Sequence, residues 1–171
     1  EIGFPLYRQT GLESDDLIAQ AAKQISLEGT GRRAVIITAD GDLYQCINEQ
    51  IHWYDPGRNL YYDANGFWMA KDVWPEQWSK VKTWIGCPGD GVPGIGGVGL
   101  KSAVDFINGR LKKTSKRHAC IIHAPKDVLK RNAVLVKLPH PKTRYLELYQ
   151  PKYSFRIFAR WYHKLGMSSY L

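Results

Sequence analysis

The sequence predicts an α/β protein in which helices flank a parallel sheet, followed by a basic helical region. Residues 12–28 carry apolar side chains at helical spacing, which is typical of an amphipathic helix. Residues 34–38, AVIIT, form a short apolar and β-branched run, which predicts a strand buried on both faces and therefore parallel to its neighbour. A helix followed directly by such a strand is half of an α/β layer.

The next elements alternate in the same way. Residues 41–47 predict a short helix, and residues 51–63 contain two apolar runs around a Pro-Gly pair, which predicts a hairpin. Residues 64–85 carry helical patterns, with Pro75 at the start of the second helix.

The second half begins with a glycine-rich stretch. Seven glycines lie within residues 86–99, so no regular element is expected there before a helix that begins near Leu100. Residues 109–119 form a basic connector, and two further helices are expected at residues 125–138 and 155–166.

Charge is unevenly distributed along the chain. Residues 1–100 hold 8 Lys+Arg and 13 Asp+Glu, whereas residues 101–171 hold 16 and 3. This asymmetry favours a polyanionic partner that the basic part binds, while the carboxylates do other chemistry. The alternative is that both parts are ordinary solvated surfaces.

Composition excludes several classes. With 171 residues and 44% hydrophobic content, the chain is long enough for one or at most two domains. No apolar run approaches the ~20 residues of a membrane span, and none resembles a signal peptide. The three cysteines, Cys46, Cys87 and Cys120, lack metal-binding spacing, so we expect a cytoplasmic protein, in the host cytoplasm if a phage encodes it. Because the first residue is Glu1 rather than Met, we expect further residues to be encoded upstream.

Two clusters of carboxylates bracket the expected strand. Asp40 and Asp42 follow its carboxyl end, where ligands of open α/β sheets bind, and Glu13, Asp15 and Asp16 begin the preceding helix. Taken alone, the second cluster could simply cap that helix. Two converging clusters would repel each other without cations, and oxygen ligands select Mg²⁺ or Mn²⁺. With phosphate as partner, the matching chemistry is two-metal phosphodiester hydrolysis.

Glu13 and Asp15 present a geometric difficulty, because residues two apart point in different directions on a regular helix. Either Glu13 lies before the first full turn, or Asp15 faces elsewhere.

Residues 93–103, PGIGGVGLKSA, offer successive backbone N–H groups before a helix start, which can hold a phosphate oxygen. The spacing differs from that of a nucleotide P-loop, because Leu100 separates Gly99 from Lys101. A glycine-rich turn alone is weak evidence of phosphate contact.

Three stretches in this order, GLESDDLIAQAA, VIITADGDLYQ and WIGCPGDGVPGIGGVGLKSA, resemble the 5′-nuclease family. This family comprises flap endonucleases, bacteriophage 5′→3′ exonucleases and the 5′-nuclease domain of bacterial DNA polymerase I. The resemblance covers about residues 5–108. It implies a partial PIN-like α/β nuclease core in residues 1–85, a helix-three-turn-helix DNA-binding element in residues 86–108 and a basic helical region in residues 109–171.

The resemblance also implies roles for individual residues. Glu13, Asp15 and Asp40 would hold a first Mg²⁺ or Mn²⁺, with Asp16 close by, and Asp42 and Asp90 would hold a second. The catalytic set would be Asp15, Asp40, Asp42 and Asp90. DNA would bind through Gly94, Gly96, Gly97, Gly99, Lys101 and Ser102, with K⁺ as a possible further ion. The basic connector adds the phosphate-binding candidates Lys112, Lys113, Lys116 and Arg117.

Two departures qualify the resemblance. Cys87 stands where the family has an Asp, and Gly91 stands where it has an Asn. A thiol is a poor ligand for Mg²⁺, so the second site should be weakened or should favour Mn²⁺; alternatively, Cys87 is an inert small side chain.

The family's first strand and helical arch have no counterpart upstream of Glu13. The resemblance therefore implies the C-terminal part of a nuclease: either a truncated fragment, or one half of a split enzyme whose N-terminal part is a separate polypeptide. The expected function is that of a 5′→3′ exonuclease or flap endonuclease acting on DNA flaps, junctions or primers in replication, with no membrane partner. The alternative is a non-catalytic, structure-selective DNA-binding subunit or degenerate nuclease.

Overall fold

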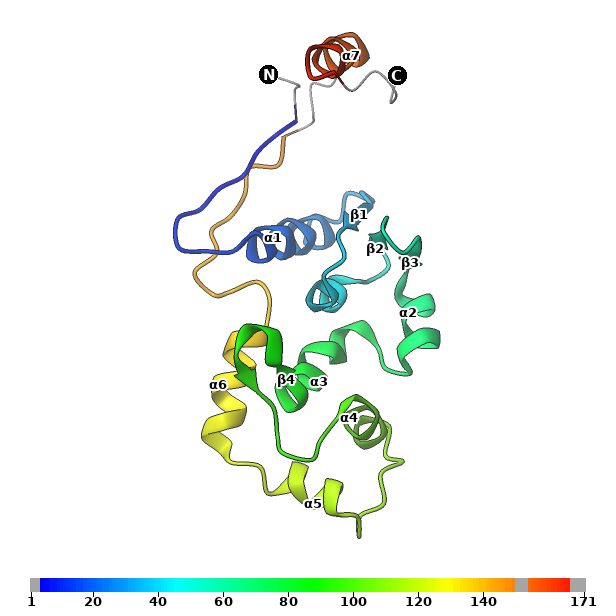
Figure 1. Cartoon of the computed structure of the whole chain (residues 1–171), viewed down its shortest axis with the longest axis vertical. Helices are drawn as coiled ribbons and strands as arrows, with labels where there is room; N and C mark the ends of the chain where they lie inside the picture. Colours follow the sequence, from blue (N-terminus) through cyan, green and yellow to red (C-terminus); the bar gives the residue numbers. More distant parts are fainter. Residues whose placement is uncertain (1–3, 150–153, 167–171) are drawn as a thin grey trace.

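The computed structural model describes residues 4–149 and 154–166. The elements of its first half are α1 (Ser14–Leu27), β1 (Ala34–Ile37), the 3-10 helix η1 (Gly41–Cys46), β2 (Ile51–Asp55), β3 (Leu60–Tyr62), α2 (Ala64–Lys71), the 3-10 helix η2 (Pro75–Gln77) and α3 (Trp78–Ile85). The strands form one sheet in the order β1-β2-β3, with β1 parallel to β2 and β2 antiparallel to β3 (Figure 1). The predictions of an α/β fold, a parallel strand and a hairpin are confirmed.

The prediction that the first strand is buried on both faces is wrong. Ile36 of β1 is buried, but Val35 and Ile37 are 49% and 68% exposed. Successive strand residues point to opposite faces, and α1 packs against β1 on the face of Ile36. The alternate face of β1 is therefore open to solvent in the described part of the chain.

An aromatic cluster forms the centre of the core and fixes the loop that follows β1. The Tyr44 ring lies 4.7 Å from that of Trp53 and 5.6 Å from that of Trp78, centroid to centroid. The indole N–H of Trp53 donates to the backbone carbonyl of Asp40 at 3.0 Å, and that of Trp78 donates to the carbonyl of Gly41 at 2.8 Å. The buried aromatic residues thus position the backbone on which the acidic side chains stand.

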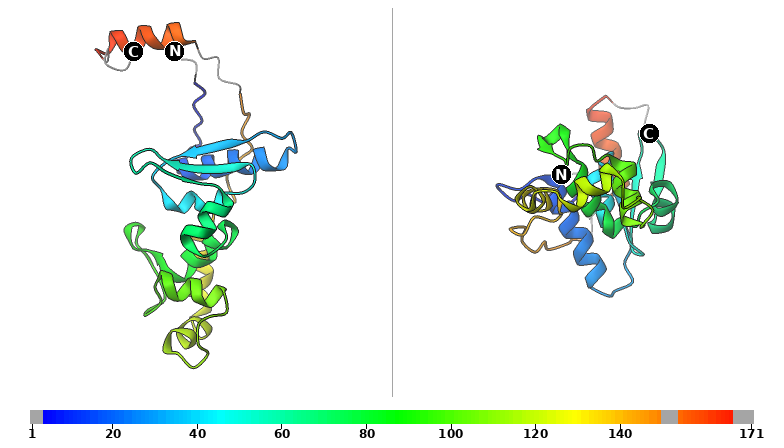
Figure 2. Two further views of the ribbon diagram at one scale, coloured as in Figure 1. Left: turned by 90° about the vertical axis from the view of Figure 1, so that its right-hand side faces the viewer. Right: turned by 90° about the horizontal axis from the view of Figure 1, so that it is seen from below.

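The second half is mainly helical. Its elements are β4 (Gly86–Cys87), the 3-10 helix η3 (Pro88–Asp90), β5 (Val92–Pro93), α4 (Leu100–Ile107), α5 (Lys116–Ile122), α6 (Lys126–Val136) and α7 (Phe155–Lys164). α6 packs against α3, and α7 lies apart from the other helices in both side views (Figures 1 and 2). The helices expected at residues 125–138 and 155–166 are confirmed.

The glycine-rich stretch is more ordered than the sequence predicts. β4 and β5 pair antiparallel, with Gly86 opposite Pro93. Gly86 has a φ of 72°, and a Cβ there would lie 2.3 Å from the carbonyl oxygen of Val92. A Cβ on Gly94 would lie 2.2 Å from the carbonyl oxygen of Ile85. These two glycines are required because backbones pack directly on each other, which allows two short strands where none was expected.

The basic connector also differs from prediction, because its last residues begin α5. The Ser115 hydroxyl accepts a hydrogen bond from the backbone N–H of His118 at 3.2 Å and caps the helix. The high density of lysine and arginine is typical of a loop, whereas Ser115 supplies the cap that starts a helix here.

The chain that follows α6 returns to the first residues. The Gln24 side chain of α1 both donates to the carbonyl of Leu146 and accepts from its N–H, each at 2.8 Å. The Gln9 side chain likewise bonds the carbonyl of Lys142 and the N–H of Arg144, each at 3.0 Å. These contacts hold the segment after α6 beside the entrance to α1, as Figure 1 shows.

Candidate metal centre

A pocket of about 250 Å³ collects acidic side chains from three separate segments. These segments are the start of α1, the loop between β1 and η1, and the turn at η3. The acidic residues that line it are Glu13, Asp15, Asp40, Asp42 and Asp90, and its other lining residues are Cys87, Val92, Leu135, Val136 and Leu138. Five of the six predicted metal ligands therefore share one pocket.

The start of α1 resolves the difficulty over residue spacing. Glu13 is the N-cap residue, with an extended backbone at φ −85° and ψ 163°, so it lies before the first turn. Asp15 stands in the first turn, and both side chains can face the same pocket. Asp16 does not line it: this carboxylate is 7% exposed and accepts a hydrogen bond from the N–H of His140 at 2.7 Å. Asp16 thus tethers the segment after α6 to α1.

Asp40 and Asp42 are arranged by a local cap. The Asp40 carboxylate accepts a hydrogen bond from the N–H of Asp42 at 2.8 Å and caps η1. The Asp40 N–H in turn donates to the Thr38 hydroxyl at 3.1 Å. Since the two indole groups hold the carbonyls of Asp40 and Gly41, this loop is fixed on both sides of its backbone.

The carboxyl groups of Asp15 and Asp40 lie close enough that the charge on one disfavours ionisation of the other. Burial, the nearby charge of Asp40 and a hydrogen bond between the two side chains together raise the pKa of Asp15 to about 6. A hydrogen bond from Ser14 acts in the opposite direction. A shared proton or an added cation would therefore stabilise the carboxyl groups of Asp15 and Asp40.

Asp42 instead has a cation of its own. Lys82, on α3, places its ammonium 2.6 Å from a carboxylate oxygen of Asp42, and the two side chains are only 18% and 25% exposed. Burial lowers the pKa of Lys82, but hydrogen bonds to Asp42 and Cys87 more than offset it, so the net shift is upward. Lys82 therefore stays protonated beside Asp42.

Asp42, Cys87 and Asp90 form a compact group. One donor atom of each lies within 4.8 Å of the others. The Cys87 thiol also donates to the second carboxylate oxygen of Asp42 at 3.6 Å. Burial raises the pKa of this thiol, although Lys82 partly counteracts the effect. Cys87 is thus held as a neutral thiol beside the carboxylates of Asp42 and Asp90.

Three further residues organise the pocket and were missed by sequence reasoning. The Gln45 side chain donates to the carbonyls of Asp42 (2.8 Å) and Val136 (3.0 Å) and accepts from the N–H of Leu138 at 3.0 Å. Asn132 of α6 is completely buried and donates to the carbonyls of Thr83 and Pro93. Gln45 could have been found from its position three residues after Asp42, but Asn132 and Lys82 looked like ordinary polar residues of amphipathic helices.

The predicted DNA-binding residues lie on a different part of the surface. Gly96, Gly97, Gly99 and Lys101 are exposed at and before the start of α4, whereas Ser102 is buried and its hydroxyl bonds the backbone of Gly99. Gly94 is half-buried against α3. Lys112, Lys113, Lys116 and Arg117 are all exposed around the start of α5.

The fold is similar to that of a phage 5′-exonuclease. The structure described as the T5 5′-exonuclease with bound zinc matches with a TM-score of 0.67 and 25% identity, over 80% of this chain and 54% of that chain. The T5 flap endonuclease in a pseudo-enzyme–product complex with DNA and metal ions matches with a TM-score of 0.68 and 24% identity, over 80% of this chain and 53% of that chain.

Sequence matches agree with the fold. A family model described as the N-terminal resolvase-like domain of 5′-3′ exonucleases matches residues 1–72. The 5′-3′ exonuclease of Aquifex aeolicus is 30% identical over 142 residues, which are 80% of this chain and 48% of that protein. The thermostable DNA polymerase I of Thermus thermophilus is 34% identical over 106 residues, 62% of this chain and 12% of the polymerase. The chain belongs to the 5′-nuclease family.

The chain thus spans about half of the Aquifex protein and a small part of the polymerase. Within residues 4–149 and 154–166, no helix is both long and apolar enough to cross a membrane.

Proposed function

We propose that this chain carries most of the metal-binding site of a divalent-metal-dependent 5′→3′ exonuclease or flap endonuclease that acts on DNA. The observation that supports this most is the convergence of Glu13, Asp15, Asp40, Asp42 and Asp90 on one pocket. Carboxylates so close together are costly unless a cation neutralises them, and Asp15 already shows that cost in its raised pKa.

The donor chemistry fits hard divalent cations. Glu13, Asp15 and Asp40 offer only oxygen ligands, which suits Mg²⁺ or Mn²⁺. Asp42 and Asp90 would hold a second ion, in a site that Cys87 and Lys82 weaken. Bound ions would supply charge neutralisation at a scissile phosphate and at its leaving oxygen. The aromatic cluster, Gln45 and Asn132 would keep the carboxylates in place.

The DNA contacts in this proposal come from the second half. Residues 86–108 act as a helix-three-turn-helix element, in which exposed backbone N–H groups before α4 and the side chain of Lys101 meet DNA phosphates, with K⁺ as a possible bridging ion. Ser102 contributes by capping α4 rather than by touching DNA. Lys112, Lys113, Lys116 and Arg117 add phosphate contacts that do not depend on sequence.

We further propose that a strand from an N-terminal nuclease part, covalently linked or separate, pairs with the open edge of β1. The N–H groups of Ala34 and Thr38 bond β2, which directs the backbone groups of Val35 and Ile37 to the other edge. An apolar hollow between α1 and β1 lies beside that edge and includes Ile18, Ala21, Ile25, Val35 and Ile37. A free edge beside apolar side chains favours strand addition.

The alternative is a structure-selective DNA-binding subunit that does not cleave. Lys82 favours it, because an ammonium group already neutralises Asp42 and would have to give way to a second ion.

Cleavage of a labelled 5′-flap separates these functions. The chain is assayed alone and with the polypeptide encoded directly upstream, in Mg²⁺ and in Mn²⁺, and Asp40→Asn is the matched variant. A nuclease loses cleavage in this variant and keeps its affinity for the flap. Flap binding without Mn²⁺ binding or cleavage under any of these conditions would favour the non-catalytic subunit. Replacing Val35 and Ile37 by lysine should abolish any stimulation by the upstream polypeptide, and unchanged stimulation would contradict strand pairing at β1.

A further inference from the structure

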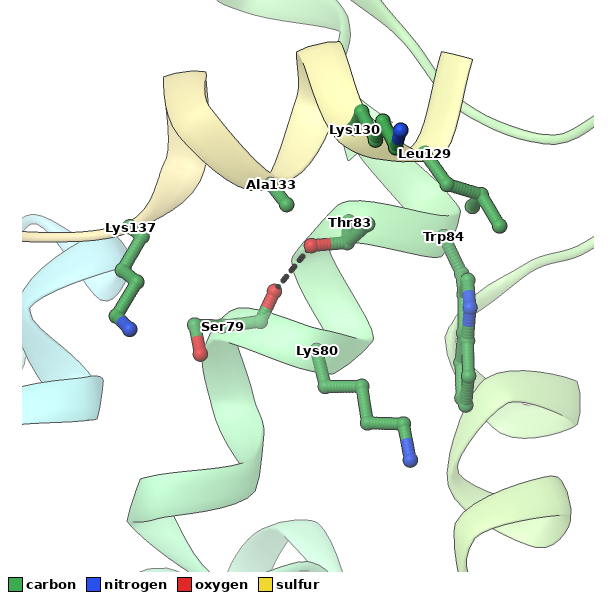
Figure 3. Close-up of a pocket in the computed structure, with 8 residues that line it drawn as sticks. All are labelled: Ser79, Lys80, Thr83, Trp84, Leu129, Lys130, Ala133 and Lys137. Atoms are coloured by element: carbon green, nitrogen blue, oxygen red, sulfur yellow. Dashed lines mark hydrogen bonds between the residues drawn. The ribbon is translucent and has the colours of Figure 1, made fainter. Parts of the chain in front are cut away.

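A second pocket, of about 380 Å³, lies between α3 and α6. Ser79, Lys80, Thr83 and Trp84 of α3 line one wall, and Leu129, Lys130, Ala133 and Lys137 line the other (Figure 3). We call this pocket the α3–α6 groove. On α3, the side chain of Lys80 is turned by about 160° around the helix from that of Lys82, which reaches Asp42, so the groove and the acidic pocket use different faces of this helix.

The groove is rimmed by positive charge that nothing nearby neutralises. Lys80, Lys130 and Lys137 are all exposed, and no Asp or Glu lines the groove. None of the ion pairs between described residues involves these three lysines. The Lys80 ammonium lies 5.3 Å from the centre of the Trp84 ring, which is a weak attraction that leaves its charge available.

The floor of the groove is apolar. The side chains of Trp84, Leu129 and Ala133 project into it, and the hydroxyl of Thr83 is occupied by a hydrogen bond to the carbonyl of Ser79 at 2.9 Å (Figure 3). An apolar floor between cationic walls suits a ligand that alternates flat apolar groups with anionic groups.

The spacing of the lysines matches such a ligand. Lys130 and Lys137 are seven residues apart along α6 and its end, which is about 10 Å at 1.5 Å per residue. Two ammonium groups this far apart can contact different phosphates of one strand.

The position of the groove favours nucleic acid over an acidic peptide. Lys137 lines the groove, and its neighbours Val136 and Leu138 line the acidic pocket. The groove and the candidate metal centre therefore lie on either side of the end of α6. A strand that leaves the acidic pocket over this end would reach the groove within a few nucleotides.

We propose that the α3–α6 groove binds a single strand of nucleic acid, with its phosphates on Lys80, Lys130 and Lys137 and its sugars and bases over Trp84, Leu129 and Ala133. The proposal rests on the proposed function and adds a strand-binding surface outside the acidic pocket and the glycine-rich turn.

The test measures binding of a fluorescein-labelled oligothymidylate of about 12 nucleotides by anisotropy. The variant Lys130→Ala/Lys137→Ala is compared with Lys23→Ala/Lys142→Ala, which removes two exposed lysines that do not line the groove. We expect the groove variant to bind about 5- to 30-fold more weakly than the control. Between about 50 and 200 mM salt, the slope of log K against log salt should fall in magnitude by about 1.4, since each contact with a single strand contributes ~0.7.

A variant that fills the groove tests the binding place independently of charge. Ala133→Phe should weaken binding while leaving the salt slope unchanged, and circular dichroism melts check that each variant is folded. Equal affinities and slopes for the two lysine pairs, or full affinity of a folded Ala133→Phe, would overturn the proposal. So would loss of poly-glutamate binding in the groove variants with retained oligothymidylate binding, which would assign the groove to an acidic peptide. If the unmodified chain binds neither this oligonucleotide nor a 5′-flap, the proposed function itself fails.

Discussion

The two sides of the acidic pocket differ in how the repulsion between their carboxylates is relieved. On one side, which we call the helix side, Glu13, Asp15 and Asp40 have no lysine or arginine among their ion-pair partners within the described residues. Burial and repulsion there raise the pKa of Asp15, so a proton relieves the charge. On the other side, the turn side, Lys82 is a built-in cation beside Asp42, and Cys87 places a thiol next to the carboxylates of Asp42 and Asp90.

This difference predicts unequal metal affinity. A divalent ion that enters the helix side replaces a weakly held proton and relieves repulsion. An ion that enters the turn side must displace the ammonium of Lys82 and use a softer ligand set. We therefore expect the first divalent ion to bind on the helix side and the second to bind more weakly.

The largest effect is expected from Asp40→Asn, which removes a carboxylate from the helix side. Asparagine keeps an oxygen that can accept the hydrogen bond from the N–H of Asp42, so the cap of η1 and the fold should survive. We expect Mn²⁺ affinity, measured by titration calorimetry, to fall by at least about ten-fold.

The matched control for this variant is Asp63→Asn. Asp63 also caps a helix, accepting from the N–H of Gly66, but it does not line the pocket. Equal Mn²⁺ affinities of the two variants would place the first ion elsewhere.

Cys87→Asp sharpens the comparison by giving the turn side a third carboxylate. We expect Mg²⁺ affinity of the second site to rise by about ten-fold, since an oxygen ligand replaces sulfur, and Cd²⁺ affinity to fall. Cys87→Ser, which is similar in size and uncharged, is the control and should not gain Mg²⁺ affinity. Equal Mg²⁺ and Cd²⁺ affinities of the second site with Cys, Asp or Ser at position 87 would show that Cys87 is only a packing group.

Lys82→Met removes the built-in cation of the turn side, whereas Cys87→Asp adds a carboxylate to it. Without metal, Asp42 loses its partner while only 25% exposed, and we expect a loss of about 1–2 kcal/mol in the free energy of unfolding by urea. Added Mn²⁺ should restore the stability, and affinity for the second ion should rise by about three- to ten-fold, because no ammonium group competes with it.

The control is Lys80→Met on the exposed side of α3, which should change metal-free stability by less than about 0.5 kcal/mol. If Lys82→Met lowers Mn²⁺ affinity instead, Lys82 supports the metal site and does not compete with it.

The convergence of the acidic side chains is the most predictable part of the molecule. The helix at α1, the strand at β1 and the hairpin have local patterns, and the acids sit where these elements begin and end. Glu13, Asp15, Asp40 and Asp42 could therefore be placed together from sequence. Asp90 could be added only through the family motif, because nothing local ties it to Asp40 and Asp42.

Other features depend on contacts that no local pattern encodes. Asp16 is the same residue type as its neighbour Asp15, yet its carboxylate accepts a hydrogen bond from the N–H of His140, 124 residues away. Lys82 looks like a solvated lysine of an amphipathic helix, yet α3 directs it into the acidic pocket. The apolar run of β1 predicted two buried faces, whereas Val35 and Ile37 are exposed, because burial depends on what packs beside a strand as well as on its own residues.

The smallest predicted effect is a pH dependence that belongs to the helix side alone. The folded protein holds a proton on Asp15 up to about pH 6, whereas the unfolded chain releases it near the ordinary pKa of 3.8. Stability from this group is therefore present in full below about pH 4 and is lost as the pH rises through about 6. Asp15→Asn lacks this titration. In EDTA, the melting temperature of the variant relative to the unmodified chain should rise between pH 4 and 7 by about 2 °C, allowing for solvent screening. Asp127→Asn, which removes an exposed carboxylate of α6, is the control, and the same drift in both variants would show that Asp15 and Asp40 do not share a proton.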